Sequence, residues 1–229
     1  RTNLGLLAGM IALILLTVLL NGFITKKPEL AQLKNQYAVL SAGSAAALFA
    51  ALIGVMAITS EFRHGTIRPT FVVTPHRSRV IAAKVISSLL MGLLFGLAAI
   101  GLSFGLGYAI LAGRDIPLAL STNDVLWLVL GTPVLTAAWA ALGVGVGAVV
   151  RNQVFAVIGL ILWTMIVDNL LIGLVPKIGG YTLMGASGAI ISDPSDYVLS
   201  AAAGGLLLLG YVAIFVTAGA VLVAHRDVT

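Results

Sequence analysis

Long apolar runs separated by short polar segments dominate the sequence. Each run has about 20 residues or more, which is enough for an α-helix to cross a hydrocarbon core of about 30 Å. Only helices and closed barrels satisfy backbone polar groups in lipid, and these runs lack the alternating pattern of barrel strands. The pattern therefore predicts an all-α integral membrane protein, a single domain over residues 1–229 with six transmembrane helices. The predicted helices cover residues 4–24, 38–59, 80–111, 125–150, 154–175 and 198–224.

The composition favours the same environment. Hydrophobic residues make up 60% of the chain and charged residues 9%, and the mean hydropathy is +1.11. A soluble domain has about 25% charged residues, so a soluble fold would leave most of this apolar surface uncovered. The sequence contains no cysteine, which excludes disulfides and thiolate metal sites.

The first apolar run is either a secretory signal peptide or a membrane anchor. We favour an anchor because the run is longer than a signal-peptide core and because no small-residue cleavage site precedes Lys26 and Lys27. The sequence begins with Arg1 rather than Met, so we expect that some of the natural N-terminus is missing from it.

Six spans place both ends of the chain on one side of the membrane, and the Lys and Arg residues indicate which side. With the N-terminus inside, eight of the 13 Lys and Arg residues are cytoplasmic, although the basic segment 26–34 then lies outside. We therefore predict an N-in, C-in, multi-pass protein of the cell membrane, a bacterial plasma membrane. The basic inner face suits anionic lipid headgroups, so the net charge of +5 does not indicate a nucleic-acid partner. The predicted cytoplasmic set is Arg1, Arg63, Arg68, Arg77, Arg79, Lys84, Arg151 and Arg226.

Motifs of the common hydrolytic and metal-dependent enzymes are absent from the sequence. It has no GxSxG elbow, no HExxH pair and no GxxxxGK[ST] phosphate loop. The histidines His64, His76 and His225 are far apart and lack metal-ligand spacing, so we interpret them as interfacial side chains. We predict that this chain has no catalytic residue, no metal site and no bound cofactor, and that any nucleotide-driven step requires a separate chain.

The segment 61–84 connects the second and third apolar runs and contains six charged residues. Its first part mixes apolar and charged side chains and is predicted to lie in the membrane interface. Pro69 interrupts that part, and Thr74 followed by Pro75 predicts a helix start. A helix over 75–111 would be about 55 Å long at 1.5 Å per residue, so its first turns must extend beyond the hydrocarbon core.

The same segment carries a specific order of residues. In that order, and in their place between the second and third of six spans, they resemble the permease subunits of type-2 ATP-binding-cassette (ABC) exporters. The six-span plan covers nearly the whole chain, whereas the motif covers a small part of it. The sequence has neither the fused ATPase nor the large extracellular domain of larger relatives. The residues that carry the resemblance are Glu61, Gly65, Thr66, Pro75, Arg77, Arg79 and Lys84.

The resemblance implies a coupling helix in the cytoplasmic loop 60–79, docked on separate ABC ATPase subunits that bind ATP and Mg²⁺. It also implies a second permease subunit, in a homodimer or a heterodimer, that completes one transport path. Glu61 matches the acidic residue that begins the family's coupling segment, and we expect it to pair with a basic group on the ATPase. The alternative is that the loop has no docking role and serves only as a topology signal and lipid anchor. The implied coupling residues are Glu61, Phe62, Arg63, Gly65, Thr66, Arg68, Arg77, Arg79 and Lys84.

Two polar residues, Asp168 and Asn169, lie within the fifth apolar run. An ionised group there costs several kcal/mol unless it reaches water or a partner, so either the helix has already reached the outer interface or Asp168 lines the route for substrate. The following segment, 176–197, is too interrupted by glycine and proline to span the membrane. We predict that it forms a re-entrant or surface hairpin on the outer face.

Glycines four residues apart lie on one face of a helix and allow another backbone to approach closely. We expect such pairs to support packing inside one subunit more than a dimer interface. The pairs are Gly92 and Gly96, Gly101 and Gly105, and Gly143 and Gly147.

These observations together predict the membrane subunit of an ATP-driven exporter that moves a lipid, drug or peptide outward by alternating access. An ion-gradient-driven transporter or channel is the alternative, but proton-coupled carriers usually hold several ionisable residues within their spans, and here only Asp168 qualifies. A non-transporting membrane scaffold or immunity protein is a third possibility. An ATPase encoded by a neighbouring gene would favour the exporter.

Overall fold

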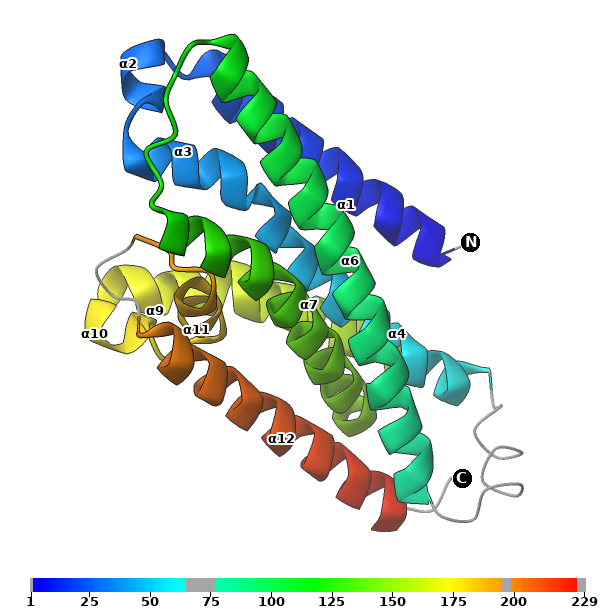
Figure 1. Ribbon diagram of the computed structural model, residues 1–229. Helices are drawn as coiled ribbons and strands as arrows, with labels where there is room; N and C mark the ends of the chain where they lie inside the picture. The colour runs from blue at the N-terminus through cyan, green and yellow to red at the C-terminus, as the bar shows by residue number, and fades with distance from the viewer. Residues whose placement is uncertain (1, 65–76, 195–198, 226–229) are drawn as a thin grey trace.

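The computed structural model describes residues 2–64, 77–194 and 199–225, and every regular element in these ranges is a helix (Figure 1). Six helical segments are long and apolar enough to cross a membrane, which confirms the predicted all-α class and the number of spans in the described part of the chain. The six segments are Asn3–Ile24, Leu33–Arg63, Arg79–Gly113, Thr122–Val150, Gln153–Leu174 and Ala201–Val223.

Several spans consist of more than one helical element, because the α-helix tightens or widens locally along them. The first combines α1 (Thr2–Leu19) with the π-helix η1 (Leu20–Ile24). The second combines α3 (Leu33–Leu40), the 3₁₀-helix η2 (Ser41–Ala45) and α4 (Ala46–Arg63), and it begins five residues earlier than the run 38–59 predicted. The other elements are α2 (Lys27–Leu30), α6 (Arg77–Gly113), α7 (Thr122–Val150), α8 (Gln153–Leu162), η3 (Trp163–Val167), α9 (Asp168–Leu174), α10 (Pro176–Gly179), α11 (Leu183–Ile190) and α12 (Ala201–His225).

Helix α7 lies at the centre of the bundle and packs against α4, α6 and α12. A capping box starts it: Ser121 Oγ accepts from the Asp124 backbone N–H, and the Asp124 carboxylate accepts from the Ser121 N–H. This pairing satisfies two of the N–H groups that a helix start leaves without partners. The helix ends at Val150, and Arg151 follows it with a left-handed φ of 57° that turns the chain toward α8.

Close backbone contact joins α7 to α4. A Cβ atom on Gly143 would lie 2.0 Å from the carbonyl oxygen of Ala51, and one on Gly54 would lie 2.0 Å from that of Ala140. Only glycine permits this approach. The predicted pairs 92/96 and 143/147 both pack inside the subunit, whereas nothing lies within 4 Å of a Cβ on either residue of the pair 101/105.

The bundle has two distinct ends. At one, which we call the basal end, lie the start of α1, the end of α4 at Arg63, the start of α6 at Arg77 and the end of α12 (Figure 1). At the other, which we call the distal end, lie α2, α3, α10 and α11. Helix α6 has the 37 residues predicted for the third helix, but the predicted start at Thr74 and Pro75 lies outside the described residues.

The predicted outer hairpin, 176–197, forms two short helices where it is described. Helix α10 begins at a proline, and α11 begins where Thr182 Oγ1 accepts from the Gly185 N–H at 3.0 Å. Neither helix is long enough to span a membrane. Helix α11 packs against α7 and α12, which holds the segment against the distal end of the bundle. Its depth relative to the membrane remains a prediction.

Candidate functional site

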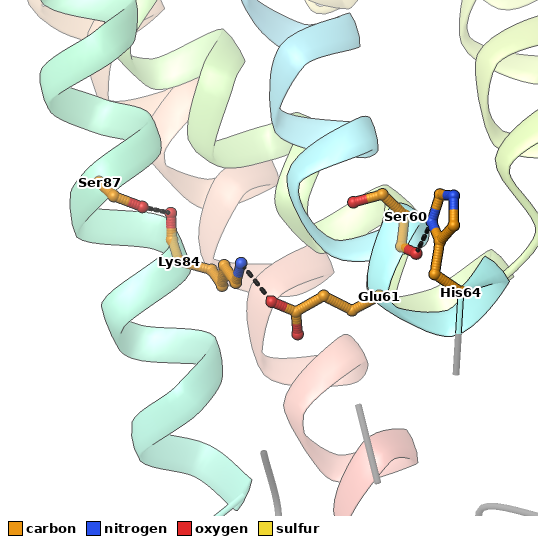
Figure 2. A network of polar contacts seen from close by, with 5 residues as sticks. All are labelled: Ser60, Glu61, His64, Lys84 and Ser87. Carbon is orange, nitrogen blue, oxygen red and sulfur yellow. Dashed lines mark hydrogen bonds and ion pairs between the residues drawn. The ribbon is translucent and has the colours of Figure 1, made fainter. Parts of the chain in front are cut away.

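An ion pair joins the two helices that flank the basic loop. Lys84 Nζ, near the start of α6, lies 2.5 Å from Glu61 Oε1, in the last turn of α4 (Figure 2). The side chains are 28% and 19% exposed, so the pair is mostly shielded from solvent. Because α4 ends at Arg63 and α6 begins at Arg77, this contact closes the base of the loop between them.

The sequence predicts a partner for Glu61 on the ATPase, but the structure supplies one within the chain. Lys84, which the sequence grouped with Glu61 as a docking residue, neutralises one oxygen of the carboxylate. The other oxygen, Glu61 Oε2, is buried and has no hydrogen-bond partner among the described residues. The pair therefore has a structural role inside this subunit, where it links α4 to α6.

A second set of contacts at the basal end centres on Arg151. Its guanidinium lies 5.5 Å from the centre of the Phe62 ring, within the range of a cation–π contact. Its Nη2 also donates to the carbonyl oxygen of Leu222 near the end of α12. Arg151 thus connects α4, α7 and α12. From the sequence, Arg151 was predicted only as one of the cytoplasmic charges, although its place in the short connection between two spans was a usable signal.

The other residues of the predicted docking set are not gathered into one described patch. Arg63 donates to the side chain of Gln153 at 3.5 Å, a long hydrogen bond, and Arg79 is exposed on α6. His64 contacts the carbonyl oxygen of Ser60 at 2.8 Å (Figure 2). Arg77 begins α6. Gly65, Thr66 and Arg68 lie outside the described residues.

A cavity of about 500 Å³ extends along the bundle, from Val150 and Phe155 near the basal end to Tyr181 toward the distal end. We call it the distal cavity, after the end that holds Asp168. Helix α7 forms its floor, the continuous segment α8–η3–α9 forms one wall, α12 forms the opposite wall, and α10 and α11 border it beyond. Most of its surface is apolar. Five aromatic side chains take part in the lining: Phe155, Trp163, Tyr181, Tyr211 and Phe215.

Asp168 belongs to the lining of this cavity and is fully buried. Its Oδ2 accepts a hydrogen bond of 3.0 Å from the backbone N–H of Met184 at the start of α11. Its Oδ1 is buried and has no hydrogen-bond partner among the described residues. The π-helix η3 immediately precedes it, and such widened turns are frequent at functional sites.

The structure separates the two residues that the sequence assigned to the substrate path. Asn169 turns back on its own helix and donates to the carbonyl oxygens of Thr164 at 3.0 Å and Met165 at 3.1 Å. It does not line the cavity that Asp168 lines. The aromatic lining was missed, because its members come from four segments whose proximity no local pattern reveals.

The two sites suit different tasks. The basal contacts link helices and flank a basic loop, and the distal cavity can hold an apolar molecule against one carboxylate. Among the described residues, no group of three or more His, Asp or Glu side chains is placed to hold a metal ion. No model of a known protein family matches the chain, and no curated protein matches its sequence.

Proposed function

We propose that this chain is the membrane-spanning subunit of an ATP-driven exporter resembling the type-2 ABC class. A separate ATPase binds ATP and Mg²⁺ and docks at the loop between α4 and α6, and a second permease subunit completes the transport path. The observation that carries the proposal is the ion pair between Glu61 and Lys84. It fastens the two helices at the point where they enter a loop whose residue order resembles a coupling segment.

The packing offers a route from the loop to the cavity. Helices α4 and α6 both pack on α7, and α7 forms the floor of the distal cavity. Because the α4–α7 contact is backbone against backbone at Gly143 and Gly54, the two helices cannot slide without separating. A force applied to the ends of α4 and α6 would therefore tilt them together and move α7 with them.

The charge distribution supports a cytoplasmic position for the basal end. The described charged residues there are Glu61, Arg63, Arg77, Arg79, Lys84 and Arg151, five of them basic. Lys and Arg are enriched in cytoplasmic loops. An ATPase that uses cellular ATP must dock on that side, so the orientation and the docking site agree.

The test is co-purification of this chain with a co-expressed ABC ATPase, followed by measurement of ATP hydrolysis and transport in proteoliposomes. Glu61→Ala should weaken association or uncouple hydrolysis from transport, because removing one member of a desolvated pair costs about 2 to 5 kcal/mol. Arg79→Glu should weaken association without touching the ion pair. Lys177→Glu makes a similar charge change at the distal end and serves as the control.

The exchanged pair Glu61→Lys with Lys84→Glu separates the docking role from the structural one. It keeps an ion pair between α4 and α6 but reverses the charge presented to the ATPase. We expect the exchanged variant to fold and to lose ATPase association. Wild-type association and coupling in the exchanged variant, in Glu61→Ala and in a Gly65 with Thr66 double substitution would overturn the docking assignment.

A second candidate function is an ion-gradient-driven transporter. The observation that favours it is the buried carboxylate of Asp168, one oxygen of which has no hydrogen-bond partner in the described part of the chain. Acidic residues within membrane spans often mark proton pathways. Transport by this chain alone in proteoliposomes, driven by a pH gradient and unaffected by ATP, would establish this function in place of the first.

A further inference from the structure

We propose that the distal cavity binds an apolar organic cation, a molecule with one protonated amine on a hydrophobic body. This molecule would be the substrate that the exporter transports, and that part of the inference rests on the proposed function. Three features of the cavity carry it: the unsatisfied carboxylate oxygen of Asp168, the aromatic lining and the volume.

A cation from outside the chain would stabilise the Asp168 carboxylate. An acidic group at membrane depth is costly unless a partner or water satisfies it. The described residues give Asp168 the backbone N–H of Met184 and the nearby side chain of Trp163, and both of these groups are neutral. By contrast, the chain provides Glu61 with the ammonium of Lys84. A protonated amine in the cavity would supply to Asp168 Oδ1 both the missing hydrogen bond and the missing positive charge.

The lining favours a cation over a neutral donor. Aromatic rings attract cations to their faces, with Trp the most effective, and Trp163 takes part in the lining together with Tyr181, Tyr211, Phe155 and Phe215. The Tyr211 hydroxyl donates to the carbonyl oxygen of Tyr181 at 2.7 Å, so its hydrogen is already used. A ligand therefore meets the ring of Tyr211 and one carboxylate, with few competing polar groups.

The volume of the cavity and the negative charge of Asp168 narrow the chemical class of the ligand further. A volume of about 500 Å³ lies within the range of about 300 to 1,000 Å³ typical of sites for drug-sized molecules. An acidic peptide or a lipid with an anionic headgroup would bring a second negative charge beside Asp168. Phe155 and Trp163 are 70% and 50% exposed, so the edge formed by α8 and η3 faces outward, where an apolar molecule dissolved in the bilayer can enter.

The experiment measures binding to the purified full chain in neutral detergent by equilibrium dialysis. The probes are 1-naphthylmethylamine, which is protonated at pH 7, and 1-naphthylmethanol, which has a similar shape and no charge. Wild-type protein should bind the amine more tightly than the alcohol. Asp168→Asn should weaken binding of the amine by about tenfold, because hydrogen bonds to charged groups are the stronger class, and should leave binding of the alcohol unchanged.

Two further variants control the interpretation. Asp115→Asn makes the same charge change at the distal end, at a side chain that is 93% exposed, and should bind both probes as the wild type does. Its φ of 51° is accepted by asparagine. Trp163→Leu keeps the carboxylate and removes one aromatic face, and should lower the ratio of amine to alcohol affinity several-fold even if Asp168→Asn fails to fold.

Equal affinity for amine and alcohol in the wild type would overturn the inference, and so would an unchanged ratio in both Asp168→Asn and Trp163→Leu. The proposed function fails separately. If the amine binds through Asp168 but no ATPase co-purifies with the chain, the binding site stands and the exporter assignment falls. If the ATPase complex forms and transports while the amine does not bind, the substrate class is wrong and the exporter assignment stands.

Discussion

Glu61 at the basal end and Asp168 toward the distal end are both shielded carboxylates, and the protein satisfies them differently. Glu61 has an ammonium 2.5 Å away, supplied by the neighbouring helix α6. Asp168 has only neutral groups beside it among the described residues: a backbone N–H from the start of the short helix α11 and the nearby side chain of Trp163. Each carboxylate keeps one buried oxygen with no hydrogen-bond partner among the described residues.

The difference distinguishes a carboxylate that stabilises the fold, Glu61, from one that can bind a ligand, Asp168. The charge of Glu61 is neutralised within the fold, so its energetic effect is to hold α4 against α6. The charge of Asp168 has no cation placed beside it by an ion pair in the described residues, and it lies against a cavity. The same chemical group therefore holds two helices together at one end, and we propose that it recognises a ligand at the other.

The largest expected effect concerns the side of the membrane on which each end lies. The chain has no cysteine, so a single introduced cysteine is the only thiol of the chain that a labelling reagent can modify. In intact cells, Lys177→Cys at the distal end should react with an impermeant thiol reagent, whereas His64→Cys at the basal end should react only after permeabilisation. Both replaced side chains are exposed. The reverse labelling pattern would place the basal end outside and contradict the docking proposal.

The two ends should also be linked through the α4–α7 contact. Gly143→Ala would place a methyl group against the carbonyl of Ala51 and should lower the free energy of unfolding in detergent by about 3 kcal/mol, the upper part of the range for overpacking. It should weaken both amine binding and ATPase coupling. Gly101→Ala is the control, because nothing lies within 4 Å of a Cβ there. A Gly143→Ala protein with wild-type stability would contradict the tight contact.

A double-mutant cycle measures the basal ion pair on its own. Glu61→Gln and Lys84→Met, singly and together, should give a coupling energy of about 2 kcal/mol in the free energy of unfolding, because the pair is largely but not fully shielded and lies between the values for surface and buried pairs. The cycle is measured by urea unfolding in detergent. Amine binding at the distal cavity should not change. A coupling energy near zero would reduce the pair to a surface contact.

The smallest effect is expected at Phe62. Phe62→Leu removes the ring beneath Arg151 and keeps an apolar side chain, so it should lower the free energy of unfolding by about 0.5 to 1 kcal/mol, the value of a cation–π contact at a partly exposed site. Phe23→Leu in η1 removes an exposed aromatic side chain and should be nearly neutral. Equal losses for the two variants would argue against a specific contact between Phe62 and Arg151.

The spans were predictable because lipid imposes one local rule on every residue. An apolar run must be long enough to cross the hydrocarbon core and must satisfy its own backbone, and both properties are contained in consecutive residues. The boundary of the second span was less predictable. Residues 33–37 are too polar to extend the apolar run, yet they are helical because Gln36, at the protein interior, donates to Pro117 O and accepts from Ala119 N.

The candidate sites were predictable only in part. Asp168 was identifiable because an acid within an apolar run is rare. Glu61 and Lys84 were identifiable because the order of residues around them resembles the coupling segment of a known permease family. That Glu61 and Lys84 pair with each other depends on the return of α6 beside α4. The aromatic lining was not predicted, because ordinary residue types in separate segments carry no local signal.

The sequence by itself determined the six helices, the basic character of one end and the isolation of Asp168, since each follows from the transfer of consecutive side chains between water and lipid. Only the tertiary structure decided which carboxylate has a cation beside it and which faces a cavity. Those outcomes depend on how closely helices approach, and backbone contacts such as that between Gly143 and Ala51 set that approach through residues 92 positions apart in the chain. Pairing between distant segments is a property of packing, and no local pattern of residues contains it.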